Sequence, residues 1–189
     1  MDDPGMEGAR WVTIAVFLKT HPPACRLAHA PNERFVAKDS WGFLGVKGPL
    51  LFLTAADGED GGLPFRILDW KTGRKIFEDS TALPYYGGFG FDFGHSVDGK
   101  LSLRYLRVVH GGCSIPDGQN CWNILRANLG LPPSDAPACT GYVGEKTDQP
   151  IALATLETPS ALQYPVEVKL FPRPTIRAIA GEVKCRPVD

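Results

Sequence analysis

The sequence predicts a mainly β fold, in which an antiparallel meander forms a sandwich or a partly closed barrel, with one short helix and two disulfides. Three observations lead to this prediction. Short apolar stretches alternate with turn sequences such as ADGEDGG, KTGR and VDGK. Glycine (21 residues) and proline (17 residues) are scattered along the chain, which favours turns over long helices. Four of the five cysteines follow Gly112, and an even number of cysteines suits a disulfide framework.

The N-terminal region has the order of a secretory signal. Arg10 precedes the apolar stretch WVTIAVFL, and LAHA supplies an A-x-A cleavage motif that ends at Ala30. Three acidic residues before Arg10 depart from this pattern, so an ordinary strand followed by a proline-rich loop is the alternative. We expect residues 1–30 to be a signal peptide or a flexible segment, and residues 31–189 to form a single β-rich domain.

Cysteine usage and charge agree with export. Cleavage after Ala30 would remove Cys25 and leave four cysteines, so the sequence predicts a periplasmic or secreted protein. The apolar stretch is too short to span a bilayer, and no transmembrane segment is predicted. With 20 basic and 21 acidic side chains, the chain lacks the basic surplus typical of nucleic-acid binders, so nucleic acid is excluded as a partner.

The meander occupies the middle of the chain, where each strand ends at a turn signal. Its expected strands are residues 41–46, 50–55, 64–70, 74–79, 88–95 and 101–110.

The register of two hairpins follows from charge and apolar pairing. A three-residue loop ending in Gly73 would place Arg66 opposite Glu78 and Asp69 opposite Lys75.

A three-residue loop around Asp98 and Gly99 would place Asp92 opposite Arg104. A two-residue loop would place Phe93 there instead, and we prefer the first register because it pairs opposite charges.

After Gly111 the sequence predicts one short helix. Asn120 is its expected N-cap, Gly130 its expected stop, and Trp122, Ile124 and Leu125 its buried side. Three strands separated by proline turns follow, the last with a bend or bulge at its glycine; they are residues 150–157, 164–171 and 175–185.

The four C-terminal cysteines are expected to form two disulfides. Cys113 and Cys121 bracket a short turn and can pair locally, which leaves Cys139 with Cys185. Two other connectivities stay open. Zinc is disfavoured because the spacing lacks two close pairs, so no metal and no cofactor is predicted.

The stretch GGFGFDFG, residues 87–94, partly matches an RNA-recognition strand, but the basic residue and the last aromatic residue of that pattern are missing. Nor do its glycines fit a phosphate-binding loop. Strand alternation places the phenylalanines, Phe89, Phe91 and Phe93, on one face, which we expect to be the core face.

The opposite face of this strand is the candidate ligand-binding surface. It carries Gly88, Gly90 and Asp92, and His95 lies at the strand end. Strand glycines allow another strand, a helix or a flat ligand to approach closely.

A catalytic pair is the competing interpretation. His95 or His110 with a carboxylate such as Asp92 could serve a secreted hydrolase. However, the two histidines lie at opposite ends of one predicted hairpin, about 20–25 Å apart in straight strands. No catalytic residue is therefore predicted.

The C-terminal part of the chain combines cysteines, an adjacent tryptophan and prolines in one pattern. Its residues are GGCS (111–114), CW (121–122), Pro137, Cys139, Tyr142, YPV (164–166) and VKCRP (183–187). This pattern resembles that of small exported bacterial proteins of unknown function. The resemblance implies export and disulfides, and it implies no activity.

The function predicted from the sequence is that of an exported, non-enzymatic domain that binds a small ligand or an envelope protein. The secreted hydrolase is one alternative. A protease inhibitor with a β-trefoil fold is another, although no threefold repeat is found.

Overall fold

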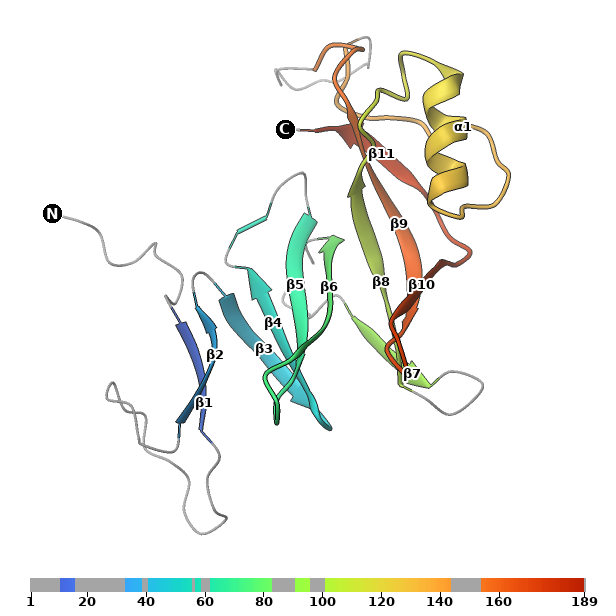
Figure 1. Cartoon of the computed structure of the whole chain (residues 1–189). Helices are drawn as coiled ribbons and strands as arrows, with labels where there is room; N and C mark the ends of the chain where they lie inside the picture. Colours follow the sequence, from blue (N-terminus) through green and yellow to red (C-terminus); the bar gives the residue numbers. More distant parts are fainter. Residues whose placement is uncertain are drawn as a thin grey trace, which may run out of the picture. The chain divides into compact units, whose positions relative to one another are not determined.

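The computed structural model describes residues 11–15, 33–38, 41–55, 57–58, 62–82, 91–95, 101–143 and 154–188. The chain divides into two compact units, which are shown in Figure 1 and described separately here. Unit 1 comprises residues 1–57 and 64–78, and unit 2 comprises residues 58–63 and 79–189.

The predicted fold class is confirmed. Nine strands belong to a mainly antiparallel sheet with the order β10-β9-β8-β6-β5-β4-β3, while β11 also pairs with β9 and β7 with β8. Among the described strands, β3 and β10 end this order without pairing to each other, so the sheet is not closed into a barrel. Of the two expected arrangements, the sandwich-like one remains.

Unit 1 contains two sets of strands. In the first, β1 (Trp11–Ala15) pairs with β2 (Glu33–Lys38). In the second, β4 (Leu50–Ala55) lies between β3 (Trp41–Lys47) and β5 (Gly62–Asp69). The first four residues of β4 are buried in succession, as expected for a strand covered on both faces. Leu51, Leu53 and Leu68 form a cluster against which Trp41 and Trp70 pack.

Strand β1 lies inside the segment predicted to be a signal peptide. Its pairing with β2 corresponds to the alternative interpretation, an N-terminal strand. The other residues of the 1–30 segment lie outside the described part of the chain. Removal of residues 1–30 stays a prediction, and it would leave β2 without this partner.

The hairpin between β5 and β6 (Lys75–Ala82) has the expected turn chemistry. Gly73 adopts a φ of 73°, which favours glycine, and the Asp69 carboxylate accepts hydrogen bonds from the backbone N–H groups of Lys71 and Thr72 at 2.9 Å. The expected ion pair between Arg66 and Glu78 is present at 3.0 Å.

Unit 2 contains the remaining strands and the helix, together with the last residues of β6. In the order of the chain, the elements are β7 (Asp92–His95), β8 (Leu101–His110), α1 (Gln119–Asn128), β9 (Ser160–Lys169), β10 (Thr175–Ala178) and β11 (Lys184–Pro187). Asp92 lies opposite Arg104, which confirms the predicted register of the β7–β8 hairpin. The loop residues 96–100 lie outside the described part of the chain.

The core of unit 2 lies on one face of β8 and β9. Residues that face each other across these strands are buried together, for example Leu103 with Val168 and Tyr105 with Val166. Phe91 contacts Tyr105 edge-to-face, with ring centroids 5.8 Å apart. Phe93 was expected in the core and is instead 37% exposed, because β7 is a short strand that pairs with β8 alone among the described strands.

The helix is confirmed, but two of its details are wrong. Its N-cap residue is Gly118 rather than Asn120, and no side chain caps it. Trp122 and Leu125 are buried as predicted, whereas Ile124 is 50% exposed because it lies on the outer side of α1. Gly130 ends the helix at a φ of 65°, as predicted.

All three predicted C-terminal strands differ from the structure. The strand expected at residues 164–171 begins four residues earlier and ends two residues earlier, as β9 (Ser160–Lys169). Residues 150–153 lie outside the described part of the chain, and residues 155–158 form a turn, closed by a hydrogen bond from Thr158 N to Thr155 O at 3.0 Å. Ala154 makes only an isolated bridge to Tyr142. The predicted strand 175–185 is broken into β10 and β11 around Gly181, which is the expected bend. A Cβ at Gly181 would meet the Pro165 ring at 2.5 Å.

In the described part of the chain, α1 falls short of the length and apolarity that crossing a bilayer requires.

Candidate functional site

Both predicted disulfides are present in unit 2. Cys113 is bonded to Cys121, with Cα atoms 5.9 Å apart, and Cys139 to Cys185, with Cα atoms 4.4 Å apart. The first bond holds the start of α1, and the second ties the segment after α1 to β11. The disulfides therefore fix the irregular part of unit 2 against its sheet.

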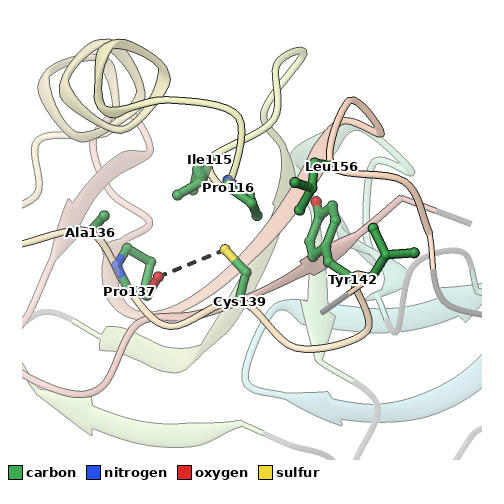
Figure 2. Close-up of a pocket in the computed structure, with 8 residues that line it drawn as sticks. Ile115, Pro116, Ala136, Pro137, Cys139, Tyr142 and Leu156 are labelled. Atoms are coloured by element: carbon green, nitrogen blue, oxygen red, sulfur yellow. Dashed lines mark hydrogen bonds between the residues drawn. The ribbon is translucent and has the colours of Figure 1, made fainter. Parts of the chain in front are cut away.

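A pocket of about 380 Å³ lies beside the Cys139–Cys185 bond (Figure 2). The side chains that line it are mostly apolar and belong to Ile115, Pro116, Ala136, Pro137, Cys139, Tyr142, Val143 and Leu156. Cys139 Sγ lies 3.7 Å from Pro137 O, and a dashed line in Figure 2 joins the two atoms. A disulfide sulfur carries no hydrogen to donate, so this is a packing contact.

The hydroxyl group of Tyr142 is engaged in hydrogen bonds within the protein and does not serve as a polar group of the pocket. It lies 2.8 Å from Ser160 Oγ and 3.1 Å from Thr158 O. Ser160 Oγ also accepts a hydrogen bond from Ile115 N at 2.9 Å. These bonds hold the pocket wall together and leave its lining without a side-chain charge.

A row of charged side chains crosses the other candidate surface, on β7 to β10 of unit 2. Asp92 on β7 lies opposite Arg104 on β8, Arg104 opposite Glu167 on β9, and Glu167 opposite Arg177 on β10. Residues directly opposite in antiparallel strands share a face. The four side chains, which alternate in sign, therefore share the face that the sequence predicted for ligand binding, and we call them the charged row.

Glu167 is the centre of the charged row. Its Oε1 accepts hydrogen bonds from Arg104 Nε at 3.0 Å and Nη2 at 2.9 Å. Its Oε2 accepts hydrogen bonds from Arg177 Nε, at 2.9 Å, and from Nη2. The two N–H donors of each arginine therefore converge on a single oxygen, and each oxygen of Glu167 holds one arginine.

The exposure of these side chains differs sharply. The Glu167 side chain is 4% exposed, whereas those of Arg104 and Arg177 are 57% and 68% exposed. The two arginines themselves cover the carboxylate. Hydrogen bonds from Arg104, and then from Arg177, lower the pKa of Glu167 below its usual value. Glu167 is therefore ionised at neutral pH, and it orients two exposed guanidinium groups.

A second polar cluster lies partly buried on the core face, with residues from β6, β8 and β9. Arg107 Nε lies 2.8 Å from Asp79 Oδ2, Tyr105 donates a hydrogen bond to Asp79, and Arg107 Nη1 donates to Tyr164 OH at 3.2 Å. Burial, followed by the Asp79 carboxylate, raises the pKa of Tyr105, so this phenol stays neutral. The cluster neutralises a buried charge and offers little surface to a ligand.

The structure places the predicted ligand-binding residues only in part. Asp92 is exposed at one end of the charged row. The backbone of His95 lies opposite Leu101, and Gly88 and Gly90 lie outside the described residues. On the same face, a Cβ at Gly94 would meet Ser102 Oγ at 3.1 Å, so the missing side chain there makes room for the neighbouring strand.

One pair of the hydrolase alternative, His110 with Asp92, does not converge. Asp92 lies opposite Arg104, and His110 lies six residues further along β8, opposite Ala161. At the usual rise per residue, this spacing is about 20 Å. The other pair, His95 with Asp92, stays a prediction, because the side chain of His95 lies outside the described part of the structure. Among the described residues, no group of three side chains that could hold a metal ion is found.

Sequence reasoning missed Glu167, Arg177 and the apolar pocket. The alternation of Val166, Glu167 and Val168 indicates only that Glu167 lies on the polar face of a strand. The arginines that cover Glu167 reach it through strand pairing between distant parts of the chain.

Comparison of the chain with protein-family models, with curated proteins and with solved structures finds no match. The resemblance to small exported bacterial proteins stays a prediction.

Proposed function

We propose that this protein is an exported, non-enzymatic binding domain that recognises an envelope partner through the charged row of unit 2. The observation that carries this proposal is the pair of exposed arginines fixed by one covered carboxylate. An arginine held in position loses less conformational freedom on binding than a free one, so the surface is preorganised.

Export is the second part of the proposal. Two disulfides form readily in an oxidising compartment and rarely in the cytosol. An exposed, charged sheet face would then meet envelope or extracellular molecules.

Site-specific photo-crosslinking tests the binding surface. A photoreactive amino acid at position 106, next to Arg104 on the charged face, should give an adduct of defined mass with one envelope protein when the oxidised chain is added to bacterial envelopes. The same group at position 71, in the exposed turn of unit 1, serves as the matched control. Equal adducts at both positions, or none at position 106, would refute this binding surface.

Intact mass tests export. Protein recovered from the periplasm of a bacterial host should start at Pro31 and gain about four hydrogens on reduction, because it would contain two disulfides. An uncleaved chain with free thiols in the cytoplasm would contradict export.

A further inference from the structure

The two arginines of the charged row keep hydrogen-bond donors that the fold does not use. A guanidinium group has five N–H donors, and Glu167 engages only the Nε and Nη2 atoms of each arginine. No hydrogen bond joins either Nη1 atom to another residue in the described part of the chain. These outward donors fit a carboxylate, which arginine binds in a planar, two-point geometry.

The balance of charge around the row favours an anion on the β10 side. Glu167 neutralises only one of its two arginines. Lys169, which follows on the same face of β9 and lies opposite Thr175, adds another positive charge. At the β7 end of the charged row, the negative charge of Asp92 lowers the electrostatic potential. This excess of positive charge stands out because the whole chain has a net charge of −1.

The same face also offers an aliphatic contact. Leu106 lies two residues beyond Arg104 on β8, opposite Pro165 of β9, and it is 43% exposed. Phe, Tyr and Trp are absent from this face of the described strands β7 to β10, so it has no ring on which a base could stack. A nucleic acid is thus a poor fit, whereas a peptide supplies both acidic and aliphatic side chains.

We infer that the partner presents an acidic peptide segment, whose carboxylates pair with Arg104 and Arg177 and whose neighbouring aliphatic side chain contacts Leu106. This inference rests on the proposed function and names the chemistry of its partner.

Fluorescence anisotropy with a labelled peptide, Gly-Glu-Leu-Glu-Glu-Leu-Glu-Gly, tests the inference on the full, oxidised chain. Arg177→Ala should weaken binding about tenfold, as expected for the loss of a charge-assisted contact. Arg177→Lys should weaken it less, because the charge remains without the planar donor pair. Combining Arg104→Ala with Arg177→Ala should abolish measurable binding.

Arg66→Ala is the matched control, because Arg66 of unit 1 also pairs with a carboxylate through Nε and Nη2. This variant should bind the peptide like the wild type. A peptide with glutamine in place of every glutamate should not bind. Near-ultraviolet circular dichroism confirms that each variant keeps its fold.

Three outcomes would overturn the inference: equal binding of the glutamine peptide, unchanged binding by the Arg104 and Arg177 variants, or equal competition by a sulfated oligosaccharide. An all-glutamate peptide that binds as tightly would overturn the contact with Leu106. If crosslinking at position 106 depends on Arg177 while the peptide fails to bind, the peptide inference is wrong and the proposed function stands. If both experiments fail, the proposed function is wrong.

Discussion

Glu78 in unit 1 and Glu167 in unit 2 have the same chemistry in different surroundings. Each carboxylate contacts two cationic side chains, and each accepts hydrogen bonds from the Nε and Nη2 atoms of an arginine. The Glu78 side chain is 35% exposed, whereas that of Glu167 is 4% exposed. The difference arises because Lys75, one partner of Glu78, lies on the same strand, while arginines from both neighbouring strands flank Glu167.

The arginines bound to the two carboxylates also differ in how much of their guanidinium surface stays accessible. Arg66 lies over the Trp41 ring, with its guanidinium carbon 4.2 Å from the ring centroid, so its flat face is already occupied. Arg104 and Arg177 are more exposed, and each is held by two hydrogen bonds to one oxygen of Glu167. An ion pair in a sheet can therefore either fasten two strands or present charge outward, depending on what surrounds the carboxylate.

The largest predicted effect is the loss of the Cys139–Cys185 disulfide, which should destabilise unit 2 much more than unit 1. Replacing both Cys139 and Cys185 with serine should destabilise unit 2 by about 4 kcal/mol, because the bond closes a loop of 46 residues in sequence separation. Hydrogen exchange should then accelerate at α1 and β11, and much less in β4 of unit 1. Uniform acceleration across both units would show that they unfold together.

The next effect compares the two carboxylates directly. Glu167→Gln should lower the free energy of unfolding by about 1–2 kcal/mol, because it removes the charge that compensates two arginines. Glu78→Gln should cost about 0.5 kcal/mol or less, because water screens that more exposed pair. Urea denaturation measures both values, and a reversed order would refute the assigned roles.

Both carboxylates should also make the free energy of unfolding depend on pH in the acid range, and Glu167 more so than Glu78. The pKa of Glu167 is lower in the folded chain than in the unfolded chain, so its contribution to stability is present above the unfolded pKa and lost as the pH falls through the folded pKa. Hydrogen bonds from Arg66 lower the pKa of Glu78 in the same sense. Wild-type stability should fall below about pH 4.5.

In an acid titration, Glu167→Gln should flatten the acid limb of the stability curve more than Glu78→Gln. Urea midpoints measured between pH 3 and 7 would check this expectation. Parallel curves for Glu167→Gln and the wild type would contradict it.

The last effect concerns the aromatic ring beneath Arg66. Trp41→Leu should cost about 0.5–1 kcal/mol through the lost cation–π contact, in addition to any change in packing. A double-mutant cycle with Arg66→Ala isolates this coupling. A coupling energy near zero would show that stacking does not hold Arg66.

Local signals predicted much of the fold. The ends of β4 and β8 match the expected ranges, because turn sequences mark them, and the alignment of Asp92 with Arg104 followed from charge pairing. Predictions from the local sequence pattern were wrong where contacts between distant parts of the chain determine burial or strand pairing. Ile124 fits an apolar helix pattern but faces outward, and residues 155–158 (Thr-Leu-Glu-Thr) form a turn where the apolar residues before them had led us to expect the end of a strand.

The candidate site was less accessible from sequence. Asp92 was predicted as a member, but Glu167 and Arg177 join it only through pairing between distant strands. Arg104 and Glu167 are 63 residues apart in sequence, and several strand orders would have satisfied the same alternation. Their convergence therefore required the structure.

The order of the disulfides has a consequence for biogenesis. The bonded cysteines are consecutive along the chain, Cys113 with Cys121 and then Cys139 with Cys185. Under the proposed export, a chain oxidised as it emerges from a translocation pore reaches this connectivity when every second thiol joins the free thiol before it, without reshuffling. A Cys25 that stayed on this chain would emerge first and pair out of this order, so the proposed removal of residues 1–30 would favour correct oxidation.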